Sequence, residues 1–231
     1  MLKQKLKRMR PAIGTFVEIE LQGSDSQSLR DSIAMGFEKI ALVEKKMSRF
    51  IESSDVGRFN KIKVGEKILV SPDLISVLKL SEELWGLSCG IFDVALGAGK
   101  IFSIQGNTLK RLGPGEIDLG GIAKGYAVDQ AVKAMEPFDV SGVVNAGGDL
   151  RVFGTETKEI FIQEAGELEP QFYPLKVNNM AVATSTYKQK TVSVFAKTCM
   201  VADALTKIVL HSSRQISDLC LSKYNARGFI P

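Results

Sequence analysis

One stretch of the chain, residues 117–129, gathers residue types that suit an anion: Ile-Asp-Leu-Gly-Gly-Ile-Ala-Lys-Gly-Tyr-Ala-Val-Asp. Its three glycines stand at the start of an apolar helical pattern and let a ligand approach bare backbone. The N–H groups and the dipole of a helix start favour negative charge, and Lys124 adds a mobile cation suited to phosphate. Asp118 can accept hydrogen bonds from hydroxyl groups or a base edge. The glycines by themselves fit a tight helix-packing turn equally well.

Further motifs decide between these readings. The 117–129 stretch resembles the signature of the ApbE family, the FAD:protein FMN transferases, and five other motifs resemble family blocks in the family's order. They lie at residues 13–15, 47–60, 90–93, 145–149 and 202–205. Each motif is weak alone, whereas six in order are specific, and the chain is identified as a member of that family.

The resemblance implies a reaction in which FMN is taken from FAD and attached to a Ser or Thr hydroxyl of a target protein, with release of AMP. Attack at a diphosphate requires neutralisation of phosphate charge. Mg²⁺ held by oxygen ligands commonly supplies it. We therefore expect FAD, Mg²⁺ and a flavin-acceptor protein as ligand, metal and partner.

The resemblance also places the FAD contacts on particular residues of this sequence. These are Ile13, Phe50, Ile91, Phe92, Asp93, Asp118 and Lys124. Ordinary core packing is the alternative for Ile13, Phe50 and Phe92, and an exposed helix position is the alternative for Lys124. Asp149, in the Asn-x-Gly-Gly-Asp turn, fits a bond within the turn and a bond to a ligand hydroxyl equally well.

For the metal, the resemblance implies the Gly121 carbonyl, together with an Asp and a Thr four residues later on the last long helix. The Asp is Asp203, but Lys207 stands where the Thr is expected, and the nearest threonine is Thr206. A one-residue step turns about 100° around a helix, so Thr206 needs a local change to act as the ligand. The Lys207 ammonium could take the place of Mg²⁺ beside Asp203. An exposed Asp203–Lys207 pair worth about 0.3–0.5 kcal/mol fits the spacing as well.

A second departure from the family lies between Thr184 and Thr191. The family has a His-x-x-Asp-Pro-x-x-Gly segment there, and this chain has neither a His nor an Asp-Pro. The one histidine, His211, lies elsewhere and is expected at a helix end. No catalytic residue is therefore predicted, although Tyr187, Lys188 or Lys190 could assist a proton transfer.

Hydrophobic periodicity predicts the elements that position these motifs. Helices are expected at about 26–47, after the Ser71–Pro72 cap, after the 117–129 turn, at 199–210 and at 218–224. Strands are expected at 15–21, 67–70, 101–104, 108–112, 142–145, 150–153, 160–163, 180–184 and 191–196, and a polar loop at 48–60. Strands and helices mix without regular βαβ alternation, which favours an α+β fold. The resemblance implies mixed, largely antiparallel sheets packed with helices (T-fold-like), as one domain over 1–231 or two small lobes with a ligand cleft between them.

Composition limits the classes of partner and the cellular location that the sequence favours. The net charge of +4 is mild, and the basic run from Lys3 to Arg10 is expected to be a solvated tail, so nucleic-acid binding is not indicated. No apolar run approaches the roughly 18 residues of a membrane span, and no signal-peptide core follows the N-terminus, which favours the cytoplasm. Cys89, Cys199 and Cys220 lack metal-type spacing and are expected to be buried thiols.

Two functions from different classes follow. One is an FMN transferase that acts on FAD with Mg²⁺. The other is a non-catalytic module that holds FAD or another nucleotide, as the missing histidine segment and Lys207 suggest. Nucleotide binding that ignores Mg²⁺ would distinguish the second from the first.

Overall fold

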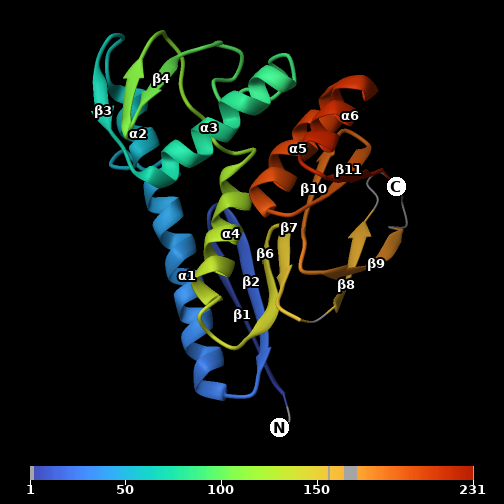
Figure 1. The fold of residues 1–231 in the computed structure, drawn as a ribbon. Helices are drawn as coiled ribbons and strands as arrows, with labels where there is room; N and C mark the ends of the chain where they lie inside the picture. The colour runs from blue at the N-terminus through green and yellow to red at the C-terminus, as the bar shows by residue number, and fades with distance from the viewer. Residues whose placement is uncertain (1–2, 156, 164–170, 231) are drawn as a thin grey trace.

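A seven-stranded antiparallel sheet forms the centre of the computed structural model, which describes residues 3–155, 157–163 and 171–230 (Figure 1). The strands, in order across the sheet, are β1 (Gln4–Ala12), β2 (Thr15–Gly23), β6 (Ser141–Ala146), β7 (Asp149–Phe153), β10 (Ala181–Tyr187), β11 (Lys190–Ala196) and β12 (Arg227–Phe229). In β2, Val17, Ile19 and Leu21 alternate with exposed or half-exposed residues. That period of two turns one face of the strand into the core.

Helices cover this apolar face. α1 (Ser26–Met47), α4 (Ala123–Met135) and α5 (Cys199–His211) lie across it, and α6 (Arg214–Lys223) packs on α5 and β12. α1 begins where Asp25 accepts a hydrogen bond from the Ser28 N–H at 2.7 Å. Its buried residues recur every three or four positions, as in Leu29, Ile33 and Phe37, so one stripe of the helix faces the sheet.

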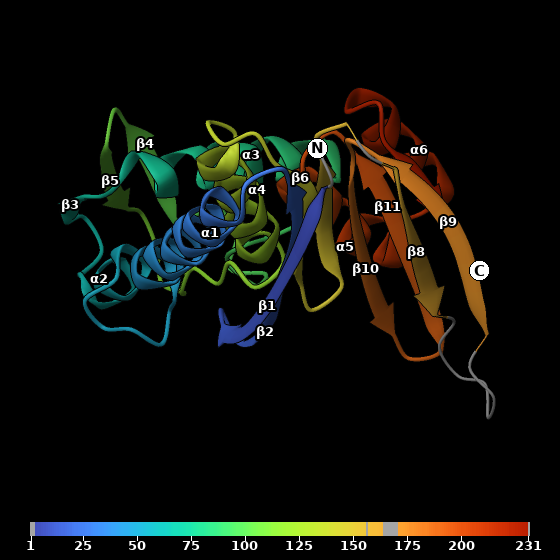
Figure 2. The ribbon, with the colours of Figure 1, turned by 90° about the horizontal axis from the view of Figure 1, so that it is seen from below.

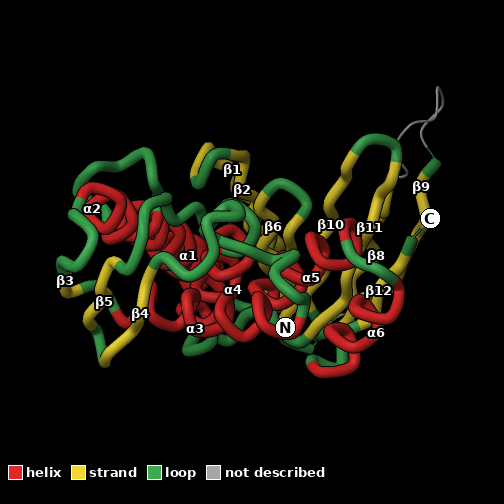
Figure 3. Tube along the Cα trace, turned by 90° about the horizontal axis from the view of Figure 1, so that it is seen from above, coloured by secondary structure: helices red, strands yellow, loops and turns green. Residues whose placement is uncertain are grey.

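A smaller lobe contains a three-stranded sheet, β3 (Lys67–Leu69), β5 (Thr108–Arg111) and β4 (Phe102–Gln105), with α2 (Asp55–Lys61) and α3 (Pro72–Leu87). Figure 3 shows this lobe at one end of the molecule. Asp73 of α3 joins it to the main helices, since it accepts hydrogen bonds from Lys46 Nζ at 2.5 Å and from the Tyr126 hydroxyl at 2.6 Å. One buried apolar cluster runs through both parts.

The opposite face of the main sheet meets a two-stranded sheet, β8 (Thr157–Gln163) and β9 (Phe172–Asn178). Figure 2 shows these strands next to β10 and β11. Val152 of β7, Val177 of β9 and Val182 of β10 form a second, separate apolar cluster. The main sheet is therefore covered on both faces over its middle strands.

The predicted α+β class with mostly antiparallel sheets is confirmed, and β4 and β5 pair as the expected hairpin. Two expectations about helices and strands were wrong. The basic N-terminal run is the edge strand β1, paired with β2 along its whole length; charged side chains are common on edge strands because they discourage further pairing. Part of the 48–60 loop is the helix α2, which Ser54 caps by accepting from the Gly57 N–H at 2.8 Å. A helix of seven residues is too short to show periodicity.

Three smaller points complete the comparison. Strand β9 was not predicted. Cys199 and Cys220 are buried as expected, but Cys89 is exposed, since it lies in a turn with a positive φ of 54°. Among the residues that the structure describes, no helix combines the length and apolar character needed to cross a membrane.

Candidate functional site

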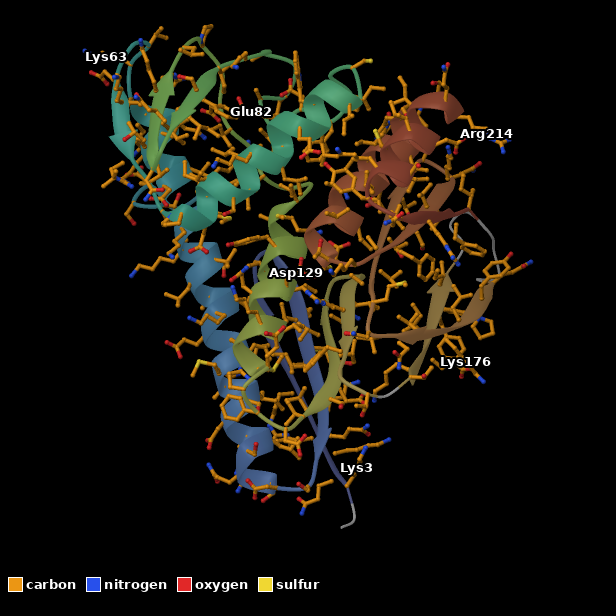
Figure 4. The ribbon with its side chains drawn as sticks, viewed as in Figure 1. Lys3, Lys63, Glu82, Asp129, Lys176 and Arg214 are labelled. Atoms are coloured by element: carbon orange, nitrogen blue, oxygen red, sulfur yellow. The ribbon has the colours of Figure 1, made fainter. Side chains whose placement is uncertain are left out.

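The N-termini of α4 and α5 meet, and each is capped by an aspartate of the other helix. The Gly125 N–H of α4 donates to Asp203 Oδ2 of α5 at 3.2 Å. Asp129 of α4 accepts in return from the Cys199 N–H at 2.9 Å and the Met200 N–H at 2.8 Å (Asp129 is labelled in Figure 4). Only glycine permits this approach, because a Cβ at position 125 would lie 2.3 Å from the Cys199 carbonyl oxygen. The 117–129 stretch, called here the signature turn, therefore also packs the two helices together.

Four charged side chains gather at this junction: Lys124, Asp149, Asp203 and Lys207, called here the Lys–Asp cluster. Lys124 Nζ forms an ion pair with Asp149 and lies 3.7 Å from Asp203 Oδ2. Lys207 Nζ lies 3.0 Å from Asp203 Oδ1. The two carboxylates are buried, with 2% and 0% of their side chains exposed, while each lysine keeps 29% exposed. Buried carboxylates thus pair with two lysines whose side chains are partly exposed.

Burial and mutual repulsion perturb the titration of these groups. Burial, together with the charge of Asp203, raises the pKa of Asp149 to about 6, although Lys124 acts against the rise. Burial alone would lower the pKa of Lys124, but the charges of Asp203 and Asp149 outweigh burial and raise it. Lys124 is therefore a permanent cation at neutral pH.

Three side-chain oxygens lie within hydrogen-bond distance of the Lys207 ammonium. Besides Asp203 it contacts Ser185 Oγ at 2.5 Å and Thr206 Oγ1 at 3.0 Å. Those two hydroxyls are 2.8 Å apart, and the Thr206 hydroxyl donates to the Asp203 carbonyl at 2.7 Å. Of the two readings of the Asp203–Lys207 spacing, an exposed surface pair is excluded, because Asp203 and Thr206 are fully buried.

The predicted metal ligands lie together, but an ammonium already stands among them. A Cβ at Gly121 would lie 3.4 Å from Lys207 Cγ, so the lysine stem runs beneath the turn that carries the expected carbonyl ligand. No group of three or more His, Cys, Asp or Glu residues suited to a metal ion occurs in the described ranges 3–155, 157–163 and 171–230. The residues at Gly121, Asp203 and Thr206 do not fit a resident Mg²⁺, since Lys207 uses the Asp203 and Thr206 oxygens itself.

A cavity of about 340 Å³ opens beside the cluster and is called here the Lys124 cleft. Its walls come from the β1–β2 turn, the end of α1 with the segment after it, and the start of α4. Ile13 lies in that turn with a φ of 46°, followed by Gly14 with a φ of 74°. Two positive φ values characterise the tight turns that join neighbouring strands of a hairpin. The turn thereby presents Ile13 to the cleft.

Among the charged residues that line the cleft are Arg49 and Asp118. Arg49 Nε lies 3.4 Å from Asp118 Oδ2, and the Arg49 guanidinium lies over the Phe50 ring at 4.9 Å. Asp118 Oδ1 accepts from the Gly120 N–H at 2.8 Å. Phe50 is 83% exposed, which excludes the core-packing alternative for it. Four of the seven residues expected to contact FAD, namely Ile13, Phe50, Asp118 and Lys124, therefore line one cavity.

The other three do not line that cavity. Phe92 is buried in the core and its ring approaches Gly121, and Ile91 is half-buried. Asp93 accepts hydrogen bonds from the N–H groups of Ala95 at 2.8 Å and Gly97 at 2.9 Å. It lines a separate cavity of about 460 Å³ between α3 and β4. Contact of residues 91–93 with FAD stays a prediction.

Sequence reasoning missed two residues of the site. Arg49 belongs to a recognised motif, and its charge beside an aromatic residue was the available signal. Ser185 gave no signal, because its role depends on strand alternation that brings it to the helix face of β10 with Ala181 and Ala183. Asp149 pairs with Lys124, which neither expectation for it had named, and its bond to a ligand hydroxyl stays a prediction.

Comparison with known proteins identifies the family of the chain. The sequence matches the ApbE family over residues 13–100 and 99–191, which is most of its length. The chain belongs to the ApbE family. The match ends before α5, so Asp203 and Lys207 lie outside it.

Two curated relatives of this ApbE family member are FAD:protein FMN transferases. The protein from Chlamydia muridarum is 28% identical over 192 residues, which cover 69% of this chain and 60% of the relative. The protein from Vibrio cholerae serotype O1 is 27% identical over 180 residues, which cover 62% and 53%. The matched part of the chain thus spans less than two thirds of the length of each relative.

Solved ApbE structures share the fold. The flavin transferase ApbE from Vibrio cholerae superposes with a TM-score of 0.86 at 21% identity, over 99% of this chain and 94% of that one. The apo flavinyl transferase ApbE from Pseudomonas stutzeri gives 0.85 at 18% identity, over 99% and 90%. The ApbE protein from Thermotoga maritima gives 0.85 at 22% identity, over 98% and 94%. At these identities the likeness concerns the fold alone.

Proposed function

We propose that this chain binds FAD in the Lys124 cleft and transfers the FMN half to a Ser or Thr hydroxyl of a target protein. The observation that carries the proposal is the convergence of Ile13, Phe50, Asp118 and Lys124 on one cavity beside the Lys–Asp cluster. These residues come from separate parts of the sequence, and the family resemblance predicts contact with FAD for each of them. The curated relatives named above carry this activity.

Each lining residue has a chemical part in the proposal. Phe50, which is almost fully exposed, offers a face on which a flavin or adenine ring can stack. The Asp118 carboxylate has acceptor capacity for ligand hydroxyls beyond its bonds to Arg49 and Gly120. Lys124 brings a permanent positive charge to the cleft for the diphosphate.

In the proposed transfer, the acceptor hydroxyl oxygen bonds to the phosphorus of the FMN half. The bond from that phosphorus to the bridging oxygen breaks, AMP leaves with that oxygen, and the hydroxyl proton passes to water. Lys124 offsets part of the charge that develops on the phosphate oxygens. The proposal includes no step through Mg²⁺, because the residues present do not fit that ion.

The test begins with FAD and the intact chain. FAD is titrated by flavin fluorescence, and the protein is then incubated with FAD and synthetic Ser- and Thr-containing peptides. Transfer yields a flavin-labelled peptide that survives denaturation and an equal amount of AMP. Failure of FAD to bind would refute the proposal. Binding with neither product would refute its transfer step and leave the second candidate.

The second candidate function is a module that holds FAD without transferring FMN. It is supported by the turn between β10 and β11, where Tyr187 pairs with Lys190 and only two residues connect the strands. The family's histidine segment has no counterpart there. A lysine also brings one charge where Mg²⁺ brings two, so it stabilises a developing phosphate charge less. Intact FAD recovered after long incubation would support this candidate.

A further inference from the structure

We infer that Lys207 is the resident cation of this site, so that the chain binds its nucleotide independently of divalent metal. The inference rests on the proposed binding of FAD in the Lys124 cleft and goes beyond it by naming the group that fills the cation position. Three observations carry it: the partners of the ammonium, the charge balance around it, and the packing of its stem.

The partners account for every donor of the ammonium. Lys207 Nζ has three N–H groups and three oxygen acceptors within 3.0 Å, on Asp203, Ser185 and Thr206. A carboxylate and hydroxyl groups are also the oxygen types that Mg²⁺ selects, at about 2.0–2.1 Å. The position therefore has the oxygen ligands of a cation site, and the Lys207 ammonium already occupies them.

The charge balance leaves no place for a third cation. The Lys–Asp cluster contains two carboxylates and two ammonium groups, joined by the contacts Lys124–Asp149, Lys124–Asp203 and Lys207–Asp203. A divalent ion at Asp203 would meet two nearby ammonium groups, and like charges repel strongly where the surroundings are partly desolvated. Such an ion would first have to displace Lys207 and break its three hydrogen bonds.

The stem of Lys207 is held in place on the way to this position. It passes under the signature turn, where a Cβ at Gly121 would lie 3.4 Å from its Cγ and 3.6 Å from its Cε. The ammonium then meets Ser185 on the neighbouring strand β10. A swing into solvent would leave Asp203, which is fully buried, with the more distant Lys124 as its remaining cation. A buried carboxylate without a close partner is costly, so the lysine stays.

The experiment compares metal binding by the intact protein and two variants, with Mn²⁺ as an electron paramagnetic resonance probe and Mg²⁺ in thermal unfolding. Lys207→Thr opens the cation position and adds a hydroxyl, whereas Lys207→Met removes the charge but keeps the space filled. We expect no saturable Mn²⁺ binding by the wild type or Lys207→Met. We expect saturable binding by Lys207→Thr, with a melting temperature that rises with Mg²⁺ concentration. Lys133→Thr, an exposed lysine of α4, controls for the substitution itself.

FAD titration in Mg²⁺ and in EDTA gives the second measurement. The wild-type Kd should change by less than about twofold, and that of Lys207→Thr by about tenfold or more, which corresponds to about 1.4 kcal/mol of coupling. Saturable Mn²⁺ binding by the wild type that Asp203→Asn abolishes would overturn the inference. So would a folded Lys207→Thr that ignores metal. If that variant does not fold, the wild-type Mn²⁺ and EDTA results decide. If FAD does not bind at all, the proposed function fails, while the Mn²⁺ comparison still tests Lys207.

Discussion

The contact between α4 and α5 makes Gly125→Ala a sharp test of the structure. A Cβ at this position would lie 2.3 Å from the Cys199 carbonyl oxygen, 2.6 Å from the Cys199 carbonyl carbon and 2.8 Å from Met200 Cα. All three atoms belong to the backbone of the first turn of α5, so no side chain can rotate away to relieve the contact. The two helices must separate, by roughly 1 Å if the closest contact is to approach ordinary van der Waals distance.

The expected loss of stability follows from two opposing effects. Overpacking of this kind costs about 1–3 kcal/mol, and the backbone contact points to the upper end. Alanine recovers up to about 1 kcal/mol relative to glycine inside a helix. The net loss is therefore about 2 kcal/mol, which for a chain of this size lowers the melting temperature by roughly 4–8 °C. Since the Gly125 N–H also positions Asp203, FAD should bind more weakly too.

Differential scanning fluorimetry and urea unfolding measure the first effect, and flavin fluorescence measures the second. Gly86→Ala is the matched control, because it changes the same residue type inside α3, where a Cβ would meet no atom within 4 Å. We expect Gly86→Ala to be neutral or slightly stabilising. A Gly125→Ala protein that melts at or above the wild-type temperature would refute the close approach of the two helices.

Three further predictions concern stability, pH and the cleft. Asp129→Asn weakens the cap of α5 and the 2.8 Å pair with Arg151, so it should lower the free energy of unfolding in urea by about 3 kcal/mol. As a control, Asp218→Asn in an exposed ion pair should change that free energy by less than about 0.5 kcal/mol. Equal effects of the two substitutions would contradict the capping role of Asp129. The pKa of Asp149 is raised from its ordinary 3.8 to about 6, so protonation of this carboxyl stabilises the fold below about pH 4, and that contribution is lost as the pH rises through 6. The stability of Asp149→Asn relative to the wild type should therefore increase from pH 4 to pH 7 by up to about 3 kcal/mol. A flat or falling difference would contradict the raised pKa of Asp149. Phe50→Ala should leave the melting temperature unchanged and weaken FAD binding by about tenfold, while Leu69→Ala, at another exposed apolar residue, should alter neither. Unchanged FAD affinity in Phe50→Ala would remove Phe50 from the site.

Local sequence signals predicted most of the fold. The α1 stripe, the Ser71–Pro72 cap of α3 and the hairpin of β4 and β5 depend on neighbouring residues, and all three were found. The strand β1 was not predicted, although it pairs with its neighbour β2 in a hairpin, because its basic composition gives little sign of a strand.

The same distinction holds for the site. Motif residues that line the cleft were predicted, because short stretches of sequence carry them. Ser185 and the pairing of Lys124 with Asp149 were not, because they depend on how β10, α5 and the β6–β7 turn meet in space. For Lys207 the spacing from Asp203 left two readings open. The complete burial of Asp203, which only the packed structure shows, excluded the exposed pair.

The mutual capping of α4 and α5 also bears on the order in which the chain folds. The hydrogen bonds between the two helices join residues 78 and 70 positions apart, and the strands β6 to β11 lie between them. Closing loops of that length costs chain entropy before any contact is gained, so contacts of this kind tend to form late. The cluster of lysines and aspartates therefore exists only once the main sheet is in place. A nucleotide that binds the Lys–Asp cluster would therefore bind only the folded protein. Its binding would slow unfolding and would not assist the earlier steps of folding.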